Sequence, residues 1–138
     1  MNGFLIDTNV VSELIKPRPS SRVVDWIDAH EEQLFHLSVL TLGEIRRGIV
    51  QLPPSRRRTD LAAWLSGDLL TRFAGRILQI DQEVADHWGH LAGAKGATIP
   101  VIDGLLAATA LQHNLTLVTR NTKDMTRTGV GLFNPWSD

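Results

Sequence analysis

The stretch Phe4-Leu5-Ile6-Asp7-Thr8-Asn9 decides how the rest of the chain is interpreted. Three apolar residues lead directly into an acid, a hydroxyl and an amide. This pattern is typical of a short buried strand that carries polar groups at its C-terminal end. In open α/β sheets, functional sites form outside the carboxyl ends of the strands. We therefore expect Asp7 to lie at such a site, where other acids join it.

Composition limits the kinds of protein that the chain can be. It has 138 residues, a formal net charge of −1 and no cysteine. This length predicts a single domain, residues 1–138, with its own core. The lack of cysteine excludes disulfides and thiolate metal sites. Neither a signal peptide nor the roughly 20 uncharged residues of a membrane span is evident, so we expect a cytoplasmic protein with no membrane contact.

Short apolar runs alternate with helical patterns along the chain. This alternation predicts a parallel sheet with helices on both faces. Helix ends are predicted where a polar residue can cap the backbone: at Ser20-Ser21, at Thr41 with Glu44 three residues later, at Asp81 and at Asn114. The five expected strands cover residues 4–6, 34–38, 76–80, 115–119 and 130–133.

Four acids occupy similar places in this pattern. Asp7 follows the first strand, Glu44 and Asp103 are expected in first helical turns, and Asp124 follows the fourth strand by a few residues. Hard cations such as Mg²⁺ prefer oxygen ligands, and such an ion can promote phosphodiester hydrolysis. The alternative is structural, because an acid in a first helical turn favours the helix dipole. That explanation suffices for Glu44 or Asp103 alone, but it is weaker for Asp7.

Other residue patterns favour structural interpretations. His87 and His90 lie on one helix, but they lack the further ligands of a zinc site, so a solvated face is expected. Arg56-Arg57-Arg58 is most often a solvated loop or helix start, with phosphate contact as the minority interpretation. The sequence contains no nucleophile elbow, dinucleotide fingerprint or P-loop.

An ordered set of motifs resembles the PIN-domain ribonucleases, in particular the VapC-type toxins of type II toxin–antitoxin systems. The motifs are Asp7-Thr8-Asn9, Thr41-x-x-Glu44-Ile45-x-x-Gly48, Asp103 followed by Ala107-Ala108-Thr109-Ala110, and Leu117-Val118-Thr119-Arg120-Asn121. The phrases Phe73-Ala74-Gly75-Arg76-Ile77-Leu78 and Phe133-Asn134-Pro135-Trp136 are similar to the FitB-like branch of that family. Each motif is weak, but their order and spacing are specific together and cover nearly the whole chain.

The resemblance implies a three-layer α/β/α sandwich around a mostly parallel central sheet. It implies a Mg²⁺- or Mn²⁺-dependent endoribonuclease that a small antitoxin holds inactive. Asp7, Glu44 and Asp103 match the acidic core of the family, with Asp7 and Asp103 as the chief metal ligands. A fourth acid commonly follows the Val-Thr strand. Here Asn121 takes the nearer position and Asp124 comes three residues later, so either could complete the site.

Supporting roles follow from the same resemblance. Thr8, Asn9, Thr119 and Asn121 are expected to orient carboxylates or substrate by hydrogen bonds. We expect Gly48 to allow close helix packing. A homodimer is also expected, with the apolar helix around Leu61, Trp64 and Leu65 as a possible interface. The candidates for RNA phosphate contacts are Arg46, Arg47 and Arg120.

Two other functions compete with this one. An aspartyl phosphotransferase would use Asp7 as its nucleophile, but that chemistry usually needs a second Asp two positions later, where this chain has Asn9. A catalytically silent RNA-binding or regulatory module on the same fold is the other alternative, because fold does not fix function. The filled set of acids argues against it.

Overall fold

The computed structural model describes residues 3–94, 96 and 98–137. Residues 32–34 and 126–128 form 3₁₀ helices, labelled η1 and η3, and residues 65–69 form a π-helical turn, labelled η2, between two α-helices. In chain order the elements are β1 (Gly3–Ile6), α1 (Thr8–Leu14), α2 (Ser21–Asp28), η1 (Glu32–Leu34), β2 (Phe35–Ser38), α3 (Val39–Val50), α4 (Arg56–Trp64), η2 (Leu65–Leu69), α5 (Leu70–Arg72), β3 (Ile77–Leu78), α6 (Gln82–Gly93), α7 (Val101–Gln112), β4 (Leu115–Val118), α8 (Thr122–Met125), η3 (Thr126–Thr128) and β5 (Leu132–Phe133).

The five strands form one parallel sheet in the order β3-β2-β1-β4-β5. The first strand of the chain is therefore the central one, and Ile6 of β1 pairs with Val118 of β4. On its other side β1 pairs with β2, and the backbone just before β2 comes very close, because a Cβ added to Gly3 would collide with the carbonyl oxygen of Leu34. Parallel pairing puts the carboxyl ends of all strands at the same edge of the sheet, and Asp7 follows β1 there.

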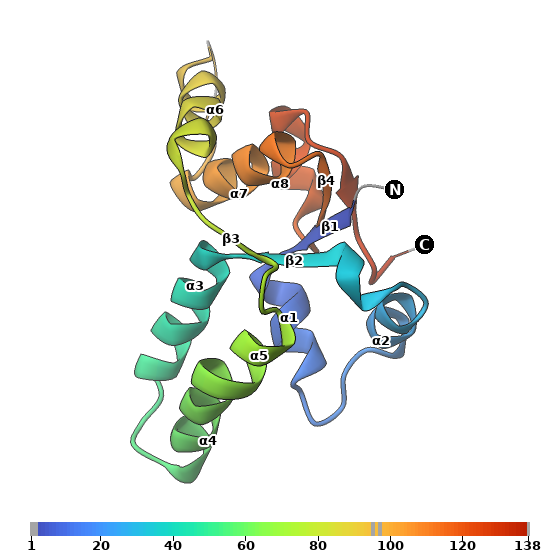
Figure 1. The fold of residues 1–138 in the computed structure, drawn as a ribbon, viewed down its shortest axis with the longest axis vertical. Coiled ribbons are helices and arrows are strands. Elements are labelled where there is room, and N and C mark those ends of the chain that lie inside the picture. Colours follow the sequence, from blue (N-terminus) through green and yellow to red (C-terminus); the bar gives the residue numbers. More distant parts are fainter. Residues whose placement is uncertain (1–2, 95, 97, 138) are drawn as a thin grey trace.

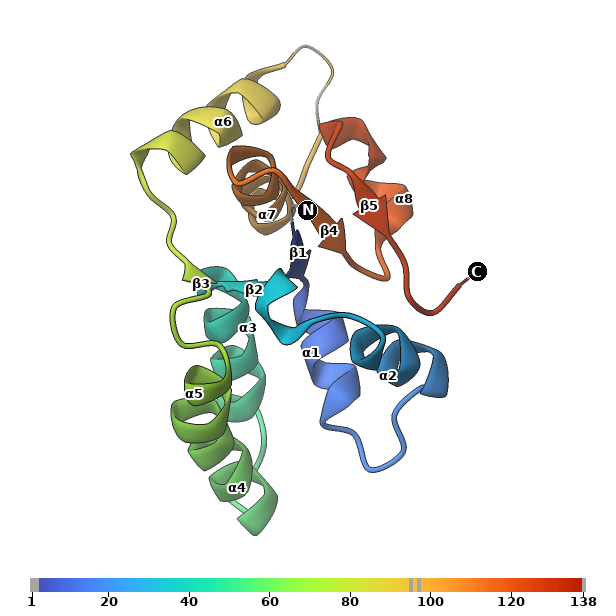
Figure 2. The same cartoon turned by 45° about the vertical axis from the view of Figure 1, so that its right-hand side comes forward.

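Helices cover both faces of the sheet, as Figures 1 and 2 show. The side chains of β1 alternate between these faces, as the pleat of a strand requires. Phe4 and Ile6 are buried in the core that contains α1, α2, α3 and the α4–η2 segment. Leu5 is buried in a second core, with Leu106 of α7 and Leu117 of β4. The predicted three-layer α/β/α sandwich is confirmed, and the sheet is entirely parallel.

One predicted helix start is wrong. The helix that carries Glu44 begins at Val39, where the Ser38 hydroxyl accepts a hydrogen bond from the backbone N–H of Leu40 at 3.0 Å. Thr41 is therefore inside α3, fully buried, and its hydroxyl has no hydrogen-bond partner among the described residues. The capping-box spacing is met by the sequence, but the preceding serine starts the helix earlier. Glu44 consequently lies in the second turn of α3.

Other predicted helix ends are mostly confirmed. Asp81 caps α6 and accepts from the backbone N–H of Val84 at 2.9 Å. Asn114 ends α7 with a left-handed φ of 54°, a conformation that asparagine tolerates. Ser20 stands at the N-cap of α2, but its side chain makes no capping hydrogen bond. The expected packing role of Gly48 is wrong, because a Cβ there would meet nothing within 4 Å.

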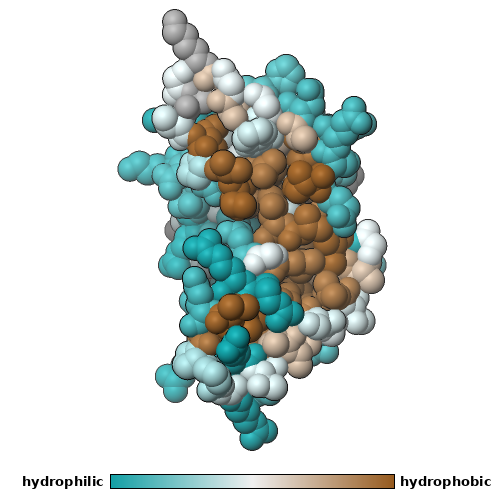
Figure 3. Space-filling model, turned by 90° about the vertical axis from the view of Figure 1, so that its left-hand side faces the viewer, coloured by the Kyte–Doolittle hydropathy of each residue, from teal (hydrophilic) through white to brown (hydrophobic). Residues whose placement is uncertain are grey.

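Apolar side chains on the surface are distributed differently from the expectation. Leu65, which was expected in a dimer interface, is buried in the core, and Leu61 and Trp64 pack against that core. A broad apolar surface instead covers the side of the molecule on which α6, β3 and α3 lie (Figure 3). Within the described part of the chain, no helix is both long and apolar enough to cross a membrane.

Candidate active site

Asp7 is held more firmly than any other acid of the candidate site. It caps α1 and is only 9% exposed. Its Oδ1 accepts from the backbone N–H of Thr8 at 2.7 Å, and its Oδ2 accepts from the hydroxyl of Thr119 at 2.8 Å. Burial raises the pKa of the Asp7 carboxyl, and the hydrogen bonds from Thr119 and Thr8 offset part of that rise.

A hydrogen bond from Thr8 of α1 holds Glu44 at the same edge of the sheet. The hydroxyl of Thr8 donates to Glu44 Oε1 at 2.6 Å, so consecutive residues Asp7 and Thr8 link α1 to both β4 and α3. Glu44 is half-buried. It also lines a cavity of about 670 Å³ between α1, α3 and α4, which extends from Glu44 along the α3–α4 hairpin.

Asp103 lies in the first turn of α7, as predicted, and is half-buried. The next residue, Gly104, fixes the position of that turn, since a Cβ there would lie 3.0 Å from Trp88 on α6. The pKa of Asp103 is raised by burial first, and then by repulsion from Asp7, Glu44 and Asp124. The fold thus brings the other three predicted acids close enough to Asp103 to act on it electrostatically.

The polar residues predicted to support the acids form a small network around one hydroxyl. Thr119 is fully buried and donates to Asp7. Its Oγ1 accepts from the backbone N–H of Asn121 at 3.0 Å and from Asn9 Nδ2 at 3.4 Å. Asn9 Oδ1 in turn accepts from the backbone N–H of Arg120 at 3.4 Å. These bonds connect the end of β4 to the start of α1.

The four acids fit a hard divalent cation by their chemistry. Carboxylate oxygens are the ligands that Mg²⁺ and Mn²⁺ prefer, and a cation would relieve the repulsion that raises the Asp103 pKa. Within the described residues, no three His, Asp or Glu side chains stand in a ready-made metal-binding arrangement. Asp7 and Glu44 are fixed by hydrogen bonds, whereas Asp103 and Asp124 make none with another described residue.

The basic and histidine candidates lie in different surroundings. Arg46 donates to Ser66 Oγ at 3.2 Å and lines a separate cavity from Glu44. Arg47 is exposed, and the Arg120 guanidinium stacks over the Trp136 ring at 4.8 Å. His90 is exposed on α6 and His87 is half-buried there, and among the described residues the two have no third ligand.

A parallel sheet with acids gathered at its carboxyl edge defines a class of α/β proteins. The chain belongs to one family of this class, the PIN-domain proteins, whose pattern matches residues 4–130. Toxin FitB from Neisseria gonorrhoeae is 40% identical over 138 residues, which cover 98% of this chain and 99% of FitB. VapC ribonuclease Y4jK from Sinorhizobium fredii is 37% identical over 136 residues, which cover 96% of this chain and 97% of Y4jK.

The fold agrees with the sequence match. A solved structure of FitAB bound to an IR36 DNA fragment is similar to this chain, with a TM-score of 0.90 and 38% identity. The similarity covers 98% of this chain and 96% of that chain. The predicted family is therefore confirmed, and PIN-domain ribonucleases generally use divalent metal ions.

Two features of the site were not found from the sequence. The capping role of Ser38 was missed, although a serine directly before an apolar helical pattern could have indicated it. The cavity shared by Arg46 and Arg58 was also missed, since it forms between two helices whose packing the sequence does not reveal.

Proposed function

We propose that the chain is a divalent-metal-dependent endoribonuclease. The observation that carries this proposal is the gathering of four carboxylates at the carboxyl edge of the sheet: Thr8 joins Asp7 to Glu44, and Asp103 in the first turn of α7 is repelled by Asp7, Glu44 and Asp124. Helix starts also meet at this edge of a parallel sheet, so helix capping could gather acids there as well. Glu44, however, lies in the second turn of α3, and no described side chain caps the start of α7. One metal ion, by contrast, needs several oxygen atoms around it.

Asp7 and Asp103 would hold the ion, with Glu44 beside them and Asp124 or Asn121 completing the site. The donor set favours Mg²⁺ or Mn²⁺ over softer metals because it contains only oxygen ligands. When bound, the ion would activate water and neutralise charge that develops on the scissile phosphate. Thr119 and the Thr8 backbone keep the Asp7 oxygens oriented, and the Thr8 hydroxyl does the same for Glu44.

The biological role that these similarities support is that of a toxin in a toxin–antitoxin pair. FitB is described as a toxin and is found together with FitA on DNA, while Y4jK is described as a ribonuclease. We infer that a small antitoxin binds this chain and blocks the acidic site, and that RNA is cleaved in the cytoplasm. A homodimer is part of the proposal, and the apolar surface in Figure 3 is a better candidate interface than the Leu61–Leu65 segment.

The test is a cleavage assay with labelled RNA and purified protein. We expect cleavage with Mg²⁺ or Mn²⁺, none with a chelator, and none for Asp103→Asn under either condition. Addition of the protein encoded next to this gene should suppress the activity. Cleavage that persists in the chelator, or that Asp103→Asn retains, would reject the metal-dependent mechanism at this site.

A further inference from the structure

The hairpin formed by α3 and α4 carries an unusual excess of positive charge. Its five arginines are accompanied by two acids, Glu44 and Asp60, although the whole chain has a net charge of −1. Arg56 and Asp60 approach to 3.9 Å, but both side chains are exposed, so this pair contributes little. Arg46 and Arg58 form no ion pair with any other described residue.

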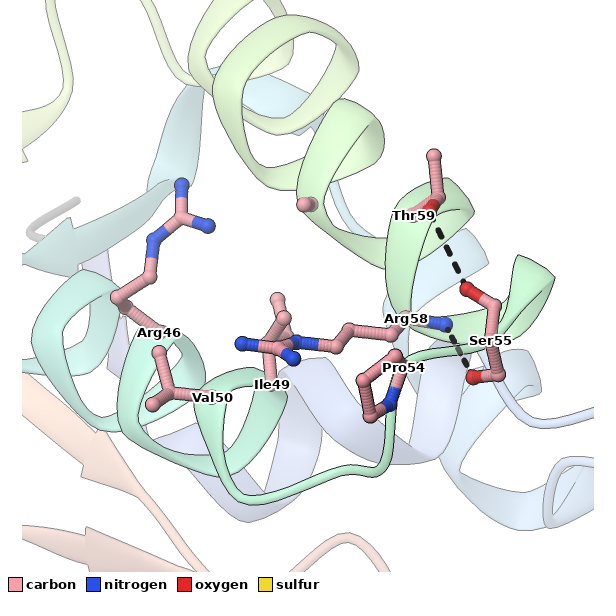
Figure 4. A pocket seen from close by; sticks show the side chains of 8 residues that line it. Arg46, Ile49, Val50, Pro54, Ser55, Arg58 and Thr59 are labelled. Atoms are coloured by element: carbon pink, nitrogen blue, oxygen red, sulfur yellow. Dashed lines mark hydrogen bonds between the residues drawn. The ribbon is translucent and has the colours of Figure 1, made fainter.

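Two of these arginines line one cavity of about 400 Å³ between α3 and α4. In Figure 4, the Arg58 side chain extends over Ile49 towards Val50, and Arg46 lies at the other side of the pocket from Thr59. Ile49, Val50, Pro54 and Ala62 supply an apolar lining. Val50 is 57% exposed, so an apolar surface stands open to solvent directly beside two guanidinium groups that form no ion pair with another described residue.

This combination matches the chemistry of a nucleotide. A guanidinium donates paired hydrogen bonds to phosphate oxygens, and its charge is always present. An apolar surface can pack against the face of a base or a ribose. The cavity lies in the size range of sites for small ligands. A protein segment would need an acid and an apolar side chain at matching positions to make the same contacts, whereas every nucleotide carries a phosphate beside a base and a ribose.

The position of the pocket relates it to the acidic site. Arg46 follows Glu44 by two residues on α3, about 3 Å along the helix axis and roughly 200° around it. The two side chains therefore leave opposite sides of a helix about 10 Å wide. An RNA strand with its scissile phosphate at the acids could cross α3 and reach the pocket within a few nucleotides.

We propose that the Arg46–Arg58 pocket binds a nucleotide of the RNA substrate a few positions away from the scissile bond. This inference rests on the proposed function. It assigns RNA binding to the two arginines of the pocket and cleavage to the acids. Arg46 and Arg58 would act on substrate affinity, because neither side chain lines the cavity that contains Glu44.

The test compares two double variants that remove the same charge. Arg46→Gln/Arg58→Gln changes the pocket, and Arg18→Gln/Arg127→Gln changes exposed arginines elsewhere on the surface. The substrates are a single-stranded RNA that the wild type cleaves and the same RNA shortened stepwise from either end. We expect the pocket variant to raise KM about tenfold or more with kcat within about twofold, as expected for lost substrate binding. The control variant should raise KM less than about threefold.

Two further readouts make the result specific. Shortening the RNA from one end should weaken cleavage by the wild type but change the pocket variant little, because the lost nucleotide and the lost pocket are the same interaction. The slope of log Kd against log salt should fall by about 0.7 for each phosphate contact removed, hence about 1.4 for two contacts. Binding is measured by fluorescence anisotropy in chelator, so that the RNA stays intact.

Each result decides between the proposals. If the wild type cleaves RNA and the two double variants behave alike, the pocket proposal is wrong and the nuclease proposal stands. If the wild type binds RNA without cleaving it, the nuclease proposal fails and the anisotropy difference alone judges the pocket. If it neither binds nor cleaves RNA, both fail. If the pocket variant binds and cleaves RNA as the control variant does but no longer binds the antitoxin, the pocket is a protein contact and our inference is wrong.

Discussion

The acidic cluster has an ordered half, Asp7 and Glu44, whose carboxylates accept hydrogen bonds, and a second half, Asp103 and Asp124, whose carboxylates make none with another described residue. Asp7 is 9% exposed and receives hydrogen bonds from a backbone N–H and from a fully buried threonine. Asp124 is exposed on the four-residue helix α8, and its side chain makes no hydrogen bond or ion pair with another described residue. Asp103 stands between these extremes, on a long helix but without a hydrogen-bonded side chain.

This difference shows which part of the site the protein orders by itself. The Thr119 hydroxyl at the end of β4 and the Thr8 backbone N–H at the start of α1 hold the Asp7 carboxylate without a bound ligand. On the other side of the cluster, burial and then repulsion from Asp7, Glu44 and Asp124 raise the pKa of Asp103. We infer that a bound cation, and not the protein alone, brings the second half of the cluster into its working arrangement.

The largest effect is expected when the ordered half loses its charge. Asp7→Asn should reduce RNA cleavage about 10³-fold, because a metal site contributes several kcal/mol of transition-state stabilisation. The substitution keeps the shape of the side chain, and asparagine caps a helix as well as aspartate does. Single-turnover cleavage at saturating Mg²⁺ measures the loss, and a circular-dichroism spectrum identical to that of the wild type is the control. A variant with more than about a tenth of the wild-type rate would contradict the assignment of Asp7.

A smaller effect is expected within the second half. Asp124→Ala should lose at least about tenfold less activity than Asp103→Ala, a difference of about 1.4 kcal/mol. Asp103 is anchored by the packing of Gly104 on Trp88, whereas Asp124 is exposed on a short helix. The comparison requires matched folding and a titration of Mg²⁺ for each variant. Equal losses at saturating Mg²⁺ would place Asp124 among the direct metal ligands.

Removal of the Thr119 hydroxyl, which donates a hydrogen bond to Asp7, is expected to cause a smaller loss of activity than removal of the Asp7 charge. Thr119→Val should lower activity about 10- to 100-fold, while Thr119→Ser should retain most of it. The Thr119 hydrogen bond lowers the pKa of Asp7, so its removal raises that pKa further. Because the ionised carboxylate binds the cation, the rising limb of the pH–rate profile should move to higher pH in the valine variant. An unchanged limb would mean that Thr119 does not act through Asp7.

The smallest effect concerns stability without metal. The pKa values of Asp7 and Asp103 are raised above the unfolded value of 3.8. Between that value and the raised pKa, the folded state holds more protons than the unfolded state. The contribution of both groups to stability therefore falls as pH rises through this range, and the full cost is present above it. In chelator at pH 7, Asp7→Asn should melt at the same temperature as the wild type or a few degrees higher.

Mn²⁺ supplies the complementary measurement. A ligand that binds only the folded state stabilises it by mass action, so millimolar Mn²⁺ should raise the melting temperature of the wild type more than that of Asp7→Asn. A variant that melts clearly lower in chelator and keeps the full Mn²⁺ shift would identify Asp7 as a structural residue.

Much of this fold could be predicted because its signals are local. The apolar run before Asp7 and the alternation of strands and helices predict the parallel sheet, which the structure confirms. The wrong predictions are of two kinds: which of two nearby residues starts a helix, and whether an apolar side chain lies in the core or at an interface. Ser38 and Thr41 are both good caps, and only the end of β2 decides which of them starts α3. Leu65 fits an interface as well as a core until the packing of the helices is known.

The site was predicted less completely than the fold. The positions of the four acids along the chain indicate candidates, but the repulsion of Asp103 by the other three arises only when β1, α3, α7 and α8 meet. The Arg56-Arg57-Arg58 run gave no reason to single out Arg58. Its distinction comes from the partner that tertiary packing brings to the same cavity, Arg46.

The central place of β1 also sets an order of events during synthesis of the chain. β1 is the first strand to be made, yet the hydroxyl that holds Asp7 belongs to a residue 112 positions later. Contacts so far apart in sequence form late in folding because closing the intervening chain costs entropy. An unfinished chain therefore contains Asp7 but lacks the sheet edge that fixes it. Under the proposed function, we expect a chain that has not been extended to Thr119 to cleave RNA less well than the finished protein.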